Sequence, residues 1–162
     1  MTRLFFCLLV AGISLPAVEA VAVAEDAKEE AILEDRKQIE GKWSIVSLVV
    51  DGNEVPDSEA RKHTVINKAD GTWSLRKEGE VISKGTSSID PTKTPKTLDF
   101  TVTEGEAKGN QYLGIYALHK KTRKMCFALP AQERPSELTS MPGSKLVCVK
   151  FERQKTDSKS AR

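Results

Sequence analysis

The sequence predicts an all-β domain, an eight-stranded antiparallel up-and-down barrel that is preceded by a short helix. Two observations carry this prediction. Eight strand-like segments follow one another after residue 40, and most of them are separated by tight turns. Gly41 and Trp43 open the first segment, where a glycine lets the chain bend into a barrel and a large rigid ring plugs one end. Eight strands form a barrel whose interior is filled by side chains or holds one small ligand.

The first 24 residues have the pattern of a secretory signal. Arg3 supplies a positive charge, and the apolar run over residues 4–15 is too short to span a bilayer and ends at Pro16. Small residues suited to cleavage follow, and we favour a cut after Ala24 because a strongly charged segment begins at Glu25. We therefore expect a secreted or periplasmic protein, and the remaining 162 − 24 = 138 residues suit one domain without a transmembrane segment.

The two ends of the predicted mature chain differ in charge. Residues 25–39 are rich in Ala, Glu and Lys and predict a short helical lead-in. Residues 154–162 form a basic tail that we expect to be solvated and disordered. The net charge of the whole chain is only +2, so no global field favours nucleic acid as a partner.

The barrel domain is expected over residues 40–153. A helical turn is predicted at residues 56–61, after the first strand and its Asp51-Gly52 turn. The longest connection, residues 130–144, precedes the last strand. The expected strands cover residues 42–50, 63–67, 72–76, 80–89, 97–103, 111–119, 123–129 and 145–152.

The first strand is apolar on both faces, which leaves its inward face open. Trp43 and Ile45 alternate with Val46 and Leu48, and both sets would suit a core. A cation from the last strand, Lys150 or Arg153, is expected to stack on the Trp43 ring. On this interpretation Gly41 and Trp43 are structural residues.

Two cysteines remain after the predicted cleavage, Cys126 and Cys148. Val147, Val149 and Phe151 form the apolar face of the last strand, so Cys148 points away from it, and Cys126 alternates with Lys124 in the same manner. A cross-strand disulfide on the outer surface and two reduced thiols both fit this pattern.

The chain contains no recognisable catalytic, nucleotide or metal motif. The two histidines, His63 and His119, and the cysteines are not at zinc-ligand spacing. No cofactor is predicted, and we expect a protein that is not an enzyme.

Several short segments occur in a fixed order along the chain: Glu40-Gly41-Lys42-Trp43, Val50-Asp51-Gly52, 90–96, 113–116, Cys126-Phe127 and 133–135. In these segments and their order the chain resembles a family of small secreted lipocalin-like domains, best known from planctomycete bacteria. Pro142-Gly143-Ser144 and an apolar last strand follow them. The resemblance covers nearly the whole predicted mature chain and implies a lipocalin-like barrel and export, but no particular reaction or ligand. Leu138 departs from the family, which commonly has an aromatic residue after the Arg-Pro pair.

The position of the long loop predicts a ligand-binding role. Loops of this length are often lids, and Arg134 within it is suited to bind an anionic group or to make a structural ion pair. Trp73, Tyr112 and Tyr116 are candidates to line a cavity or to fill it as core. We therefore expect a non-catalytic exported protein that holds a small amphiphilic ligand. The alternative is a structural or interaction module with a filled barrel.

Overall fold

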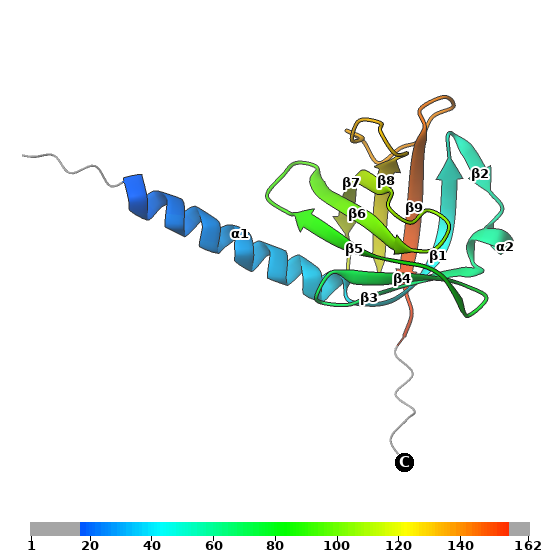
Figure 1. The fold of residues 1–162 in the computed structure, drawn as a ribbon, viewed down its shortest axis with the longest axis horizontal. Helices are drawn as coiled ribbons and strands as arrows, with labels where there is room; N and C mark the ends of the chain where they lie inside the picture. The colour runs from blue at the N-terminus through cyan, green and yellow to red at the C-terminus, as the bar shows by residue number, and fades with distance from the viewer. Residues whose placement is uncertain (1–16, 156–162) are drawn as a thin grey trace, which may run out of the picture.

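The computed structural model describes residues 17–155, which form two helices and nine strands around one barrel (Figure 1). The helices are α1 (Ala17–Ile39) and α2 (Asp57–Ala60). The strands are β1 (Gly41–Val50), β2 (Asn53–Val55), β3 (His63–Asn67), β4 (Thr72–Lys77), β5 (Glu80–Asp90), β6 (Lys96–Glu104), β7 (Gln111–Leu118), β8 (Thr122–Ala128) and β9 (Leu146–Arg153).

The strands form one antiparallel sheet that closes on itself. Neighbours in the sheet follow chain order from β3 to β9, and β1 pairs with β3 on one side and with β9 on the other. This closure confirms the predicted eight-stranded up-and-down barrel, and each predicted strand boundary lies within one residue of the observed one. The strand that sequence reasoning missed is β2, a three-residue hairpin extension that pairs with the end of β1.

A β-bulge explains why both faces of β1 are apolar. The register between β1 and β9 shifts between Ile45 and Ser47, which inserts one extra residue into β1. Trp43 and Ile45 therefore face the interior before the bulge, and Leu48 faces it afterwards. The bulge therefore lets each of the two apolar faces of β1 point into the interior over part of the strand.

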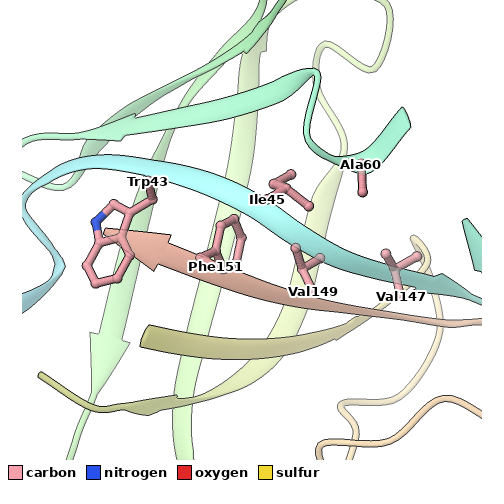
Figure 2. Close-up of a cluster of buried hydrophobic side chains, with 6 residues drawn as sticks. All are labelled: Trp43, Ile45, Ala60, Val147, Val149 and Phe151. Atoms are coloured by element: carbon pink, nitrogen blue, oxygen red, sulfur yellow. The ribbon is translucent and has the colours of Figure 1, made fainter. Parts of the chain in front are cut away.

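Trp43 lies at one end of the row of buried side chains, opposite to Val147 (Figure 2), and near the residue at which α1 ends. Its side chain is completely buried, and its indole Nε1 donates a hydrogen bond of 2.8 Å to the Ile39 carbonyl. The Arg153 guanidinium stacks on the ring at 4.3 Å and donates to the carbonyls of Gln38 and Glu40. Gly41 has a φ of +116°, and a Cβ there would lie 2.9 Å from Arg153, so this tight end requires glycine.

The C-terminal half of α1 is held against the barrel by polar contacts. Asp35, which is 5% exposed, accepts hydrogen bonds from Lys96 Nζ at 2.7 Å and from the Tyr116 hydroxyl at 2.6 Å. Arg36 donates to the Ser87 hydroxyl at 2.9 Å. Nearer the start of the helix, Lys28 pairs with Asp90 at the end of β5, at 2.9 Å. These contacts fix the helix that the sequence predicted at residues 25–39.

The observed helix begins earlier than predicted, at Ala17, inside the segment predicted to be a signal. Residues 1–16 of that segment and residues 156–162 of the predicted tail lie outside the described part of the chain. Within residues 17–155, no helix combines the length and apolar character needed to cross a membrane.

Cys126 and Cys148 form a disulfide between neighbouring positions of β8 and β9. Both residues alternate with side chains that face the interior, so the bond lies on the outer wall of the barrel. The long loop at 130–144 covers it there, since Cys126 is fully buried and its Sγ lies 3.6 Å from the Thr139 carbonyl oxygen. Ser140 ties the same loop to its surroundings by accepting from the Gly52 amide and donating to the Leu146 carbonyl.

Candidate functional site

The interior of the barrel contains a cavity of about 280 Å³. Its wall is mostly apolar and draws on seven strands, with β9 contributing Val147, Val149 and Phe151 and β8 contributing Met125 and Phe127. These residues occur at every second position of their strands, so the period of the sheet directs them all to one face. The polar side chains of the wall are His63, Asn67, Ser87 and Arg123.

Arg123 is the exceptional member of this wall. It lies on the same face of β8 as Met125 and Phe127, and only 3% of its surface is exposed. Its guanidinium carbon lies 4.4 Å from the centre of the Phe151 ring and 5.0 Å from that of Trp43. These distances are those of cation–π contacts, which hold the guanidinium in place without neutralising its charge.

No acceptor for Arg123 is found among the described residues. Its Nε is buried without a hydrogen-bond partner, and no carboxylate of residues 17–155 forms an ion pair with it. Burial, and secondarily the nearby Arg153 cation, lower the pKa of Arg123 to about 9. The group is therefore still charged at neutral pH, and the neighbouring charge that acts on it, Arg153, has the same sign.

The other polar groups of the wall differ in how well they are satisfied. The Asn67 side-chain nitrogen is also buried without a partner among the described residues. Asn67 pairs with Gly41, so it lies at the Trp43 end of the barrel, as Arg123 does. Ser87, in contrast, accepts from Arg36 and donates to the Gly71 carbonyl at 3.1 Å. The cavity thus has two unsatisfied donor groups near its closed end.

Of the four ligand-binding candidates from the sequence, Trp73 lines the cavity. It lies over Gly85, where a Cβ would come within 2.4 Å of the indole, and its Nε1 donates to the Thr86 carbonyl. Tyr112 does not line the cavity; its ring stacks on Phe100 with centres 4.8 Å apart. Its role is to support an aromatic cluster of the interior.

Tyr116 also lies outside the cavity wall, at the α1 end of the barrel. It is 2% exposed, and burial together with its bond to Asp35 raises the pKa of its hydroxyl. The hydroxyl therefore stays protonated and acts as a donor to the helix. This contact makes Tyr116 part of the attachment of α1.

Arg134 lies on the outer wall, away from the cavity. Its two terminal nitrogens pair with the two carboxylate oxygens of Asp99, at 3.0 Å for Nη2, and Nη1 also donates to the Gly114 carbonyl at 2.7 Å. Asp99 faces outward because its neighbours Leu98 and Phe100 line the cavity. The structure thus places Arg134 in a structural ion pair with Asp99, which is the second of the two roles that the sequence left open.

Arg123 was missed by sequence reasoning, although a signal for it was present. Arg123, Met125 and Phe127 alternate with Lys124 and Cys126, so the period of the strand places an arginine on the inward face. Charged side chains are seldom fully buried, and for that reason Arg123 was not predicted to face the interior.

Residues 17–155 contain no group of three or more His, Cys, Asp or Glu side chains placed to hold a metal ion. The chain matches no protein-family model, no curated protein and no solved structure among those compared. Any functional assignment therefore rests on the residues and geometry of the chain itself.

Proposed function

We propose that this chain is an exported, non-catalytic binding protein that holds one small, partly apolar ligand inside its barrel. The observation that carries the proposal is the apolar cavity inside the barrel, with a small set of polar groups in its wall. Small-molecule sites in proteins have this composition, in which apolar surface supplies affinity and a few polar groups orient the ligand.

The cavity volume limits the size of the ligand. An apolar cavity of about 150 Å³ accommodates benzene, which has six carbon atoms. A cavity of about 280 Å³ by the same proportion takes about eleven non-hydrogen atoms. Medium-chain molecules such as octanoate and its neutral analogue octanamide, with ten non-hydrogen atoms each, are therefore suitable probes.

The alternative, a structural or interaction module, expects side chains to fill the interior. Cavity space next to Val149 favours ligand binding over that alternative. The test is to titrate octanoate and octanamide into the wild type and into Val149→Phe, whose added ring occupies the cavity. Binding of at least one probe to the wild type, and its loss in Val149→Phe, is expected.

The matched control is Val81→Phe, the same substitution at a position that is 43% exposed. This variant should bind as the wild type does. Failure of both probes to bind the wild type, or equal binding by Val149→Phe, contradicts the proposed function. Circular dichroism on each variant separates lost binding from lost folding.

The export part of the proposal rests on Arg3, the apolar run at 4–15 and the small residues before Glu25. Cleavage after Ala24 would retain the helix contacts described above, which involve Lys28 and later residues. N-terminal sequencing of protein from its own host should return Glu25 or a nearby residue. A sequence that begins at Met1 or Thr2 would contradict export by cleavage.

A further inference from the structure

We propose that the ligand is an amphiphilic carboxylate that binds head inward, with its charge against Arg123 and its apolar tail directed along β8 and β9 toward Val147. This inference rests on the proposed binding function and adds the charge and the orientation of the ligand.

Arg123 is a buried cation in the wall of the cavity. A charge buried without a partner is strongly unfavourable, and proteins usually pair such groups or bind an ion at them. Arg123 is almost completely buried, and its acceptors are absent from the described residues. Most of the desolvation of Arg123 is already paid in the folded protein, so an anionic ligand meets a cation that has little hydration left to lose.

Two other arginines near the cavity, Arg153 and Arg134, differ from Arg123 in their contacts. Arg153 donates to the backbone carbonyls of Gln38 and Glu40, and Arg134 is paired with Asp99. Both therefore have structural partners, and neither lines the cavity. Arg123 combines access to the cavity with unused donors, which distinguishes it from these two.

The inward residues of β8 and β9 give the cavity a direction. Arg123 pairs with Phe151 in the sheet, and Phe127 pairs with Val147. The inward residues of β9 therefore lead away from the guanidinium over four residues, which is about 13 Å of strand. Arg123 and Asn67 place polar donors at the Trp43 end, and the inward side chains of β8 and β9 toward Val147 are apolar. An amphiphile of matching polarity binds with its head at Arg123.

The donors at the Trp43 end favour a carboxylate as the head group of the ligand. A guanidinium presents parallel N–H donors that match the two oxygens of a carboxylate. The Asn67 amide supplies a further donor group in the same wall. An amide head group offers a single neutral acceptor and so should bind less tightly than a carboxylate of the same size.

The experiment compares octanoate with octanamide by calorimetric titration. The wild type should bind octanoate at least ~10-fold more tightly than octanamide, as expected for a charge-assisted hydrogen bond in a buried site. Arg123→Met should abolish this preference, and the matched control Arg134→Met should retain it.

Each outcome has a distinct meaning. Equal binding of the two probes by the wild type overturns the inference but leaves the proposed function intact, whereas absence of binding by both contradicts the proposed function itself. Retention of the preference in Arg123→Met, or its loss in Arg134→Met, also overturns the inference. The wild-type comparison decides the matter even if Arg123→Met fails to fold.

Tryptophan quenching tests the orientation. The chain has two tryptophans, so Trp73→Phe leaves Trp43, which lies beside Arg123, as the single fluorophore. Bromine next to the head, in 2-bromooctanoate, should quench Trp43 more strongly at saturation than bromine at the tail, in 8-bromooctanoate. Stronger quenching by the tail-labelled acid would show that the ligand binds in the opposite direction and would overturn the head-inward proposal.

Discussion

Replacement of Arg123 by methionine should stabilise the ligand-free protein. Burial, and secondarily repulsion by Arg153, lower the pKa of Arg123 from 12.5 to about 9, so keeping the charged form inside the barrel costs on the order of 5 kcal/mol. Cation–π contacts with Trp43 and Phe151 offset this cost by about 0.5–2 kcal/mol each. Methionine retains an unbranched apolar side chain in the same space, so a net gain of about 1–4 kcal/mol is expected.

The assay is equilibrium unfolding in urea at pH 7 in the absence of ligand, with Arg134→Met measured in parallel. Arg134→Met removes one partner of a half-buried ion pair and should lower the free energy of unfolding. A loss of more than about 1 kcal/mol in Arg123→Met would refute the reasoning, because it would mean that Arg123 stabilises the fold. A residue that costs stability in the free protein, and is needed for ligand preference, is characteristic of a binding group.

Three further predictions concern the fold. Trp43→Ala should lower the free energy of unfolding by about 3–5 kcal/mol, because it empties the fully buried plug; a loss below about 1 kcal/mol in urea melts would contradict this role. Replacing both Cys126 and Cys148 by alanine should cost on the order of 3 kcal/mol, since the bond closes a loop with a sequence separation of 22; an unchanged melting temperature would argue against it. Hydrogen bonds from Thr92 and Lys28 lower the pKa of Asp90 from 3.8 to about 2. Its carboxylate therefore stabilises the fold above about pH 4 and loses this effect as the pH falls through 2, so Asp90→Asn should lose less stability than the wild type between pH 5 and pH 2; equal losses would contradict the assignment.

The regular features of the fold could be predicted from local sequence patterns. Alternation of apolar and polar residues gave the eight barrel strands, and β6 is the clearest example, with Leu98, Phe100 and Val102 on one face. The pattern also indicated that Cys126 and Cys148 point outward, although the choice between a disulfide and free thiols needed their register, which makes them direct cross-strand neighbours. Stacking of Arg153 on Trp43 was one of two options in the sequence, and the structure selects it over Lys150.

The irregular features could not be predicted, because they depend on tertiary context. The bulge in β1 is invisible in a strand whose two faces are equally apolar, since its position is set by pairing with β9. The path of the 130–144 loop depends on Asp99, which lies 35 residues before Arg134 and attracts it to the outer wall. The role of Arg123 depends on which partners are absent, and a strand pattern reports the direction of a side chain but says nothing about its partners.

A crystal structure of the protein with octanoate tests the central claim most directly. The account predicts octanoate inside the barrel, with its carboxylate oxygens within hydrogen-bond distance of the Arg123 guanidinium and its tail toward Val147. Octanoate found on the outer wall beside Arg134, or a barrel interior that side chains fill around Val149, would contradict it.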